Sequence, residues 1–201
     1  MKRTVLCALA VAMLCASCNK AVDAIVEKAI GSPSPTNASG FATYTIQSGN
    51  HYADGNSHKS INLLQQSFLV RFDSSAIYQT RSAENQYDIN KLWGFSDNSG
   101  AHHEFSARIG WRWSDGALRL FAYVYNDGIA ASKEISTVAI GKEVRCNISA
   151  TPTAYLFTVD GASVSMPRTS KTATIAGYQL YPYFGGDEVA PHAITIRIKV
   201  L

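Results

Sequence analysis

Charged residues are scarce in this sequence, and neither sign dominates. Only 16% of the 201 residues are Asp, Glu, Lys or Arg, and the formal net charge is +3. Two of the 18 basic residues, Lys2 and Arg3, stand at the extreme N-terminus, so the remaining 16 face 15 acidic residues. This balance implies no nucleic-acid partner, because such proteins carry an excess of basic residues. The hydrophobic content of 46% excludes a disordered chain.

Apolar runs of transmembrane length are also absent. The run from Val5 to Leu14 is too short to cross the hydrocarbon core of a bilayer as a helix. It follows Lys2 and Arg3 and ends in small residues and a cysteine, which is the pattern of a secretory signal peptide.

The segment "LCASC" resembles the bacterial lipobox, with Ala16 and Ser17 before Cys18 and with Cys15 where leucine is usual. We therefore expect residues 1–17 to be a lipoprotein signal peptide and Cys18 to be lipidated. Several acyl chains on one residue anchor a protein stably, so we expect a lipid-anchored protein of the cell envelope, at the outer membrane of a Gram-negative bacterium. The alternative is a secreted protein that is cleaved near Ser17.

Cysteine is too rare for a disulfide framework. Of the four cysteines, Cys7 and Cys15 leave with the signal peptide and Cys18 carries lipid. Cys146 remains alone in "EVRCNISA", where it alternates with Val144 and Ile148. This pattern predicts a buried thiol on a strand.

A tether and a linker precede the folded domain. In residues 19–30, Val22, Val26 and Ile30 recur at intervals of four, which favours a short amphipathic helix. The following "GSPSPTNASG" is rich in proline, serine and glycine and predicts a linker. We therefore assign residues 18–40 to the lipidated tether and linker and residues 41–201 to one domain.

After the linker, no segment shows a sustained helical period, and short alternating runs are separated by turn residues instead. The expected strands are 41–47, 60–73, 91–97, 104–113, 117–126, 134–140, 143–150, 153–159, 162–167, 177–184 and 192–200. So many strands with regular turns predict an all-β antiparallel sandwich of jelly-roll type.

Two "DG" pairs, Asp115-Gly116 and Asp160-Gly161, stand between alternating segments and predict tight hairpin turns. Taking Asp115 and Gly116 as loop residues sets the register of the flanking strands. The apolar pairs are then Trp113 with Leu118, Trp111 with Leu120, Ile109 with Ala122 and Ala107 with Val124. We expect this face to lie in the core, and Trp93, next to Gly94, to lie either in the core or at a groove edge.

The remaining core prediction follows the same alternation. We expect the core to include Phe68, Val70, Phe72, Ile109, Trp111, Leu120, Val124, Leu156, Phe157 or its neighbour, Ile194, Ile196 and Ile198.

The opposite face of the hairpin is polar and aromatic. Its pairs are Arg112 with Arg119, Gly110 with Phe121, Arg108 with Tyr123 and Ser106 with Tyr125, with Glu104 at the far end. Paired arginines repel each other unless an anion, a carboxylate or a ligand relieves them. Aromatic faces stack on sugar rings while polar side chains bind hydroxyls, so we predict a carbohydrate-binding platform of Arg108, Tyr123, Tyr125, Glu104 and Phe121. A sheet face that is simply covered by a loop is the alternative.

Signals for metal binding are weak. His102 and His103 point to opposite faces if they lie on a strand, and His192 is distant in sequence. Oxygen ligands for calcium are available from Asp97, Asn98, Asp187 and Glu188, but without the spacing of an EF-hand. We predict no cofactor, with calcium at these four residues as the alternative.

The hairpin "AYLFTVDGASVSMP", followed by "YQLYPYFGGDEVAPHAITIRIKV", resembles the C-terminal half of laminin-G and concanavalin A-like domains. The section "FDSSAIYQTRSAENQYDINKLWGFSDNSGAHHEFSARIGWRW" is similar to that of uncharacterised bacterial surface lipoproteins with such a domain. The resemblance covers about residues 41–201. It implies a concave sheet that often binds oligosaccharide, and some members of these families are glycosidases or lyases.

The residues that such enzymes use are mostly missing. Retaining glycosidases of this fold carry paired glutamates on one strand, whereas Glu104 is followed on its face by Ser106 and Arg108. Arg108, Tyr123 and His103 would suit a lyase, but the "R-x-E" and "Q-x-H" signatures of alginate lyases are absent. We therefore expect glycan binding by a surface lipoprotein, with a polysaccharide lyase or glycoside hydrolase as the first alternative and a structural or adhesion protein as the second.

Overall fold

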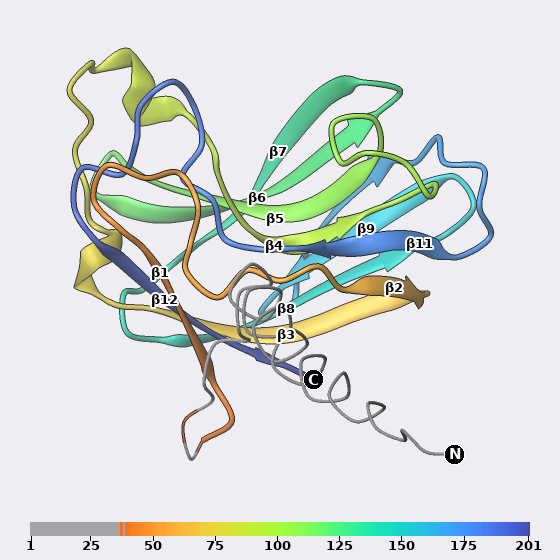
Figure 1. Cartoon of the computed structure of the whole chain (residues 1–201), viewed down its shortest axis with the longest axis horizontal. Coiled ribbons are helices and arrows are strands. Elements are labelled where there is room, and N and C mark those ends of the chain that lie inside the picture. The colour runs from red at the N-terminus through yellow and green to blue at the C-terminus, as the bar shows by residue number, and fades with distance from the viewer. Residues whose placement is uncertain (1–36, 38) are drawn as a thin grey trace, which may run out of the picture.

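The alternating segments form two antiparallel sheets that pack face to face (Figure 1). The computed structural model describes residue 37 and residues 39–201. The expected signal peptide, Cys18 and the helical tether lie outside the described residues. Within the described part of the chain, no helix is long and apolar enough to cross a membrane.

Each sheet has six strands. Sheet I contains, in spatial order, β1 (Ala42–Ile46), β12 (Ile194–Val200), β3 (Gln65–Phe72), β8 (Glu143–Ala150), β9 (Ala154–Val159) and β10 (Ala162–Pro167). Sheet II contains β2 (Ser60–Leu63), β11 (Ile175–Leu180), β4 (Asn90–Ser96), β5 (Ser106–Ser114), β6 (Ala117–Asn126) and β7 (Ile129–Val138). Two short 3₁₀ helices, η1 (Ser74–Ala76) and η2 (Glu84–Tyr87), lie between β3 and β4.

The predicted antiparallel β-sandwich is confirmed, with one difference in how the strands divide. The single strand expected over residues 60–73 is two strands, because the chain changes sheets at the exposed Leu64. β2 pairs with β11 in sheet II, whereas β3 pairs with β8 and β12 in sheet I.

The core lies between the sheets and consists of the inward side chains of both. Trp113 is only partly buried, and the other predicted core residues are all buried except Leu156, which is 42% exposed. Its neighbours Tyr155 and Phe157 point inward, and successive residues of a strand face opposite sides. Leu156 therefore lies on the outer face, and its assignment to the core was wrong. The free Cys146 is buried on β8, as expected.

The hairpin of β5 and β6 has the predicted register. Arg108 pairs with Tyr123, Trp111 with Leu120, and Ser114 closes the hairpin against Ala117. Trp111 is fully buried, while Trp113 is partly buried at the edge of the core.

A β-bulge in β4 decides the place of Trp93. The register against β5 shifts between Lys91 and Trp93, so that Leu92 and Trp93 are both buried although they are neighbours. Trp93 packs on Tyr44 at 5.4 Å and on Tyr181 at 5.1 Å between ring centres. It belongs to the core, and the bulge leaves Lys91 on the outer face of sheet II.

Candidate ligand-binding cleft

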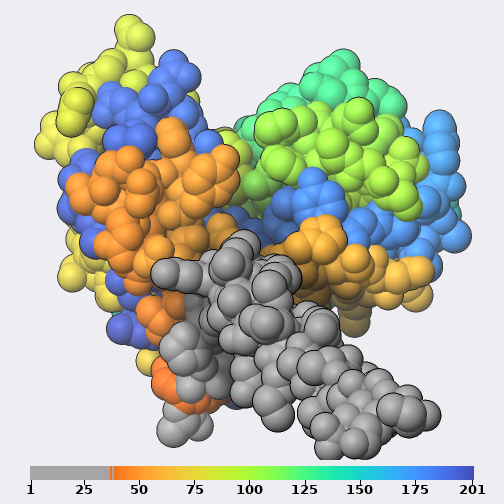
Figure 2. All heavy atoms as spheres, in the orientation of Figure 1, coloured from red at the N-terminus to blue at the C-terminus, as the bar shows by residue number. Residues whose placement is uncertain are grey.

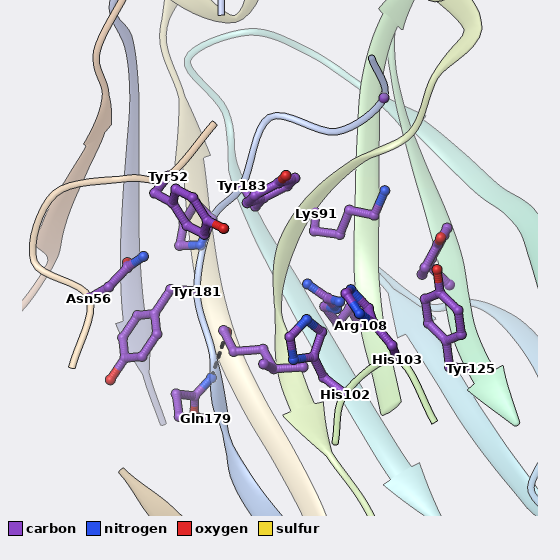
Figure 3. A pocket seen from close by; sticks show the side chains of 14 residues that line it. Tyr52, Asn56, Lys91, His102, His103, Arg108, Tyr125, Gln179, Tyr181 and Tyr183 are labelled. Carbon is purple, nitrogen blue, oxygen red and sulfur yellow. Dashed lines mark hydrogen bonds between the residues drawn. The ribbon is translucent and has the colours of Figure 1, made fainter. Parts of the chain in front are cut away.

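A cavity of about 410 Å³ opens on the outer face of sheet II. Figure 2 shows a hollow between a lobe coloured orange, yellow and blue and a lobe coloured green, and the cavity lies there. Its floor comes from β4, β5 and β11, and its walls come from loops and from β6 (Figure 3). The lining residues are Tyr52, Asn56, Lys91, His102, His103, Arg108, Tyr123, Tyr125, Gln179, Leu180, Tyr181, Pro182, Tyr183 and Gly186.

Three of the five residues predicted to bind carbohydrate line this cavity, namely Arg108, Tyr123 and Tyr125. The other two lie outside its lining. β5 begins at Ser106, so Glu104 belongs to the preceding turn, where it is exposed. Phe121 is 5% exposed and lies beneath the guanidinium of Arg112, 4.7 Å from the ring centre.

Arg108 forms a cationic floor. Its partner across the sheet is Gly94, where a Cβ atom would lie 2.9 Å from Cγ of Arg108, so glycine makes room for the arginine. Arg108 is 6% exposed, its Nε is buried without a hydrogen-bond partner, and no described carboxylate forms an ion pair with it. Burial lowers the pKa of Arg108 to about 10, so the guanidinium is still charged at neutral pH. A buried charge is costly without a partner.

Lys91 adds a second cationic group beside Arg108. Its Nζ donates a hydrogen bond to the carbonyl oxygen of Ile89 at 2.7 Å and lies 4.6 Å from the ring centre of Tyr123. Burial, followed by the charge of Arg108, lowers the pKa of Lys91 to about 8. The amine therefore changes its charge within a mildly alkaline range.

Gln179 is held in one orientation at the floor. Its Nε2 donates to the carbonyl oxygens of Gly94 at 2.7 Å and Leu180 at 2.9 Å, and its Oε1 accepts from Nε2 of Gln66 at 2.6 Å. Because Gln66 belongs to β3 of sheet I, this hydrogen bond joins the two sheets through the core.

Two histidines occupy the turn before β5. Nδ1 of His102 lies 2.9 Å from the hydroxyl of Tyr178, and the rings of His102 and His103 are 4.1 Å apart. Burial lowers the pKa of His102 to about 4, and the charges of Arg108 and His103 add to this effect. The ring of His102 is therefore neutral at physiological pH and acts there as a hydrogen-bonding group.

Aromatic rings form both walls. On one side Tyr52, which is 66% exposed, meets Tyr183 edge-on at 5.0 Å, and His51 stacks on Tyr183 from behind at 5.2 Å. On the other side Tyr123 and Tyr125 lie 5.8 Å apart. Figure 3 shows Tyr52 and Tyr183 on one side and Tyr125 on the other, with Lys91 and Arg108 between them.

No Asp or Glu side chain lines the cavity within the described part of the chain. The lining combines two cationic side chains, neutral hydrogen-bonding groups and tyrosine rings. Such a cavity attracts anions and offers flat apolar surfaces to a ring-shaped ligand.

The arginine pair predicted beside this site is relieved by the protein itself. Arg119 contacts Glu134 at 3.0 Å and Asp115 at 3.5 Å, while Arg112 donates to the carbonyl oxygen of Tyr87 at 2.8 Å. The space above Gly110 is filled by the side chain of Ile89. This part of the face is therefore closed, and the cavity ends beside it.

The residues considered for metal binding do not converge. Within the described residues, no group of three or more His, Cys, Asp or Glu side chains is placed to hold a metal ion. The carboxylate of Asp97 is fully buried and accepts hydrogen bonds from Nε of Arg168 at 2.8 Å and from the hydroxyl of Tyr155 at 2.7 Å. That of Glu188 accepts from the backbone N–H groups of Arg81 and Ser82.

The remaining members of that set lie elsewhere. Asn98 uses its side-chain oxygen to accept from the backbone N–H of Lys171, Asp187 is exposed, and His192 hydrogen-bonds the carbonyl oxygen of Ser75. The proposed calcium ligands therefore serve different loops.

Sequence reasoning missed most of one wall and half of the floor. Two expected strands, 91–97 and 177–184, supply the residues that were missed, namely Lys91, Gln179 and Tyr183. The alternation of residues along each strand did not show that these side chains lie beside Arg108. The three tyrosines of "YQLYPYF" are the signal that marked this segment.

Comparisons with known proteins identify the fold. No protein-family model matches the chain, and no curated protein does. Among solved structures, the alginate lyase AlyC3 is similar with a TM-score of 0.56 at 9% identity, over 80% of this chain and 74% of that chain.

Two glycan-degrading enzymes are also similar in fold, with slightly lower TM-scores. The catalytic domain of an endo-1,3-beta-glucanase (laminarinase) from Thermotoga petrophila RKU-1 has a TM-score of 0.51 at 10% identity, over 80% of this chain and 75% of that chain. A glycoside hydrolase family 16 endo-glucanase from Bacteroides ovatus has a TM-score of 0.50 at 10% identity, over 84% of this chain and 88% of that chain. These likenesses show that the described part of the chain has the fold of a jelly-roll β-sandwich.

Proposed function

We propose that the cavity on sheet II binds an acidic oligosaccharide, whose carboxylate lies on Arg108. The observation that carries this proposal is the buried Arg108, whose Nε has no hydrogen-bond partner and which forms no ion pair with a described carboxylate. A sugar carboxylate supplies the charge-assisted hydrogen bonds that Arg108 lacks, and arginine is suited to bind it in a bidentate manner.

The rest of the lining suits the sugar ring. Tyr52 and Tyr183 offer ring surfaces on one side and Tyr125 offers one on the other, while His102 presents a polar ring for hydroxyl groups. The fold supports a glycan as the ligand. Among the similar structures, AlyC3 is described in complex with dimannuronate, an anionic disaccharide, with a TM-score of 0.52 and 8% identity.

The absence of Asp and Glu from the described lining favours anionic over neutral glycans. Carboxylates commonly bind the hydroxyls of neutral sugars, and here they would repel a uronate. We therefore take uronic-acid polymers as the ligand class and neutral glucans as the control class.

Calorimetric titration of the purified protein with oligosaccharides of alginate and of polygalacturonate tests the proposal, with laminarin oligosaccharides as the neutral control. Arg108→Met should weaken uronate binding at least tenfold, since a hydrogen bond to a charged group contributes about 1.5–3 kcal/mol. Arg71→Met removes an exposed arginine of sheet I and should leave the affinity unchanged. Equal binding of laminarin, or full affinity in Arg108→Met, contradicts the proposal.

We also propose that the domain is presented at the outer membrane of a Gram-negative cell through lipid on Cys18. Support comes from the order of basic, apolar and small residues before Cys18. Metabolic labelling with a fatty acid should mark the wild type and not Cys18→Ala. Equal labelling of both would leave the lipid anchor without support.

A further inference from the structure

The cavity contains the groups needed for cleavage by elimination, and its described lining lacks those needed for hydrolysis. Hydrolysis of a glycosidic bond commonly uses two carboxyl groups, one as the acid and one as the base or nucleophile. No carboxyl side chain lines the cavity within the described residues. The groups that can carry a proton there are the Lys91 amine, two imidazoles and several phenols.

A uronate bound on Arg108 would be prepared for elimination. Its C5–H bond is adjacent to the carboxylate, so loss of the C5 proton places negative charge on the carboxylate oxygens. A fixed guanidinium in a site of low water content stabilises this developing charge. Arg108 is buried and charged, as this role requires.

Lys91 is the best placed proton acceptor. Its Nζ lies over the ring of Tyr123, and Figure 3 shows its side chain beside that of Arg108. Its hydrogen bond to the Ile89 carbonyl leaves the nitrogen lone pair available once the amine is neutral. His102 is the weaker base of the two because its pKa lies near 4. Tyr123 holds its proton, because burial raises the pKa of its phenol above the ordinary value.

We propose that Lys91 accepts the C5 proton of a uronate held by Arg108, so that this chain cleaves acidic polysaccharides by β-elimination. This inference rests on the proposed function, because the uronate must first bind on Arg108. Lys91 would touch the reacting atom and is a catalytic residue in this scheme, whereas His102 orients the sugar.

The step balances without any further reactant. The C5–H bond breaks and the proton moves to Nζ of neutral Lys91, giving an ammonium group. The electron pair of that bond forms the C4=C5 double bond while the C4–O bond to the neighbouring sugar breaks. The leaving oxygen then takes a proton from the Lys91 ammonium, which restores the neutral amine.

The groups around Lys91 set the pH range of the step. Arg108 on β5 disfavours the ammonium form, Asp88 before β4 favours it, and Tyr123 on β6 and Tyr183 after β11 are neutral neighbours. Burial is the largest influence, and together these lower the pKa to about 8. The rate should therefore rise with pH through about 8 as the neutral amine forms.

The test measures unsaturated uronate, through the ultraviolet absorbance of the new double bond, with alginate, polygalacturonate and hyaluronan as substrates. Lys91→Arg keeps the positive charge but cannot act as a base, since arginine does not deprotonate in this range. The Lys91→Arg variant should bind alginate oligosaccharides with an affinity within about threefold of that of the wild type. Its rate of product formation should fall at least about 100-fold, which is the usual contribution of a general base. Arg108→Met should lose both binding and product, and Arg71→Met neither.

The outcomes separate this inference from the binding proposal. If the wild type binds uronate oligosaccharides but none of the three polymers yields unsaturated product, elimination is refuted and binding stands. If no uronate binds, both proposals fall. If Lys91→Arg keeps its rate while His102→Gln or Tyr123→Phe abolishes it, the base is another residue and the assignment of Lys91 is wrong.

Discussion

Replacing Arg108 by methionine should make the protein more stable while it removes the affinity for anionic sugars. The arginine is buried on the outer face of β5, has no ion pair with any described carboxylate, and leaves Nε without a partner. A charge in that position is desolvated without compensation from the protein. Methionine has a similar length and no charge, so it should remove the cost and keep most of the packing.

The pKa of Arg108 gives the size of this effect. Burial lowers it from 12.5 to about 10. Because one pKa unit corresponds to about 1.4 kcal/mol, the charged guanidinium loses about 3 kcal/mol on folding. We expect Arg108→Met to raise the free energy of unfolding by about 1–3 kcal/mol at neutral pH. Since the folded pKa is the lower one, the penalty is complete below it and disappears only as the pH rises from about 10 to 12.5.

Urea unfolding followed by tryptophan fluorescence measures this gain as a higher midpoint at an unchanged slope. The control is Arg71→Met, whose side chain is 44% exposed in a surface ion pair with Glu143. It should change stability by less than about 1 kcal/mol. A loss of more than about 1 kcal/mol in Arg108→Met would refute the reasoning, because it would show that the guanidinium supports the fold.

Three other predictions concern residues around the core and the cavity. Trp111→Ala should lower the free energy of unfolding by about 3–5 kcal/mol, as measured by thermal and urea unfolding, because this side chain is fully buried. Tyr123→Ala should weaken uronate binding in calorimetry by about 1 kcal/mol or more and cost little stability. If this variant unfolds while Trp111→Ala folds normally, the register of the β5–β6 hairpin is contradicted. Arg168→Met should cost about 3–5 kcal/mol, because it leaves the buried Asp97 without its cation. Burial alone would raise the pKa of Asp97, but Arg168 and the other hydrogen-bond donors hold it below its ordinary value. The stabilisation from ionised Asp97 is present at neutral pH and is lost as the pH falls through that lowered pKa. The loss of unfolding free energy in Arg168→Met should therefore shrink in strong acid. A loss that does not change with pH would argue against a stabilising Asp97–Arg168 ion pair.

The sequence predicted the register of the β5–β6 hairpin correctly because that register depends only on residues that are close together in the chain. A two-residue "DG" turn joins the strands, so the register follows from counting outward, and alternation then separates Trp111 from Arg108. The same counting extended the strand too far at its start. The chain turns before Ser106, which removed Glu104 from the sheet face.

The other half of the site depends on which strands are neighbours, and alternation does not contain that information. β11 lies beside β4 although six of the twelve strands, β5 to β10, lie between them in the chain, so Gln179 reaches the floor through a distant pairing. Lys91 faces the cavity because of a bulge, and a period of two does not reveal a bulge. Trp93 was ambiguous for the same reason.

The side chain of Ile89 that fills the space above Gly110 also bears on the amine in the cavity. Nζ of Lys91 is held by the carbonyl oxygen of that same Ile89. A methyl group at residue 110 would meet the Ile89 side chain, move its backbone and so shift the amine. Gly110 lies outside the cavity lining, so a substitution there changes the position of the amine without replacing any side chain of the lining.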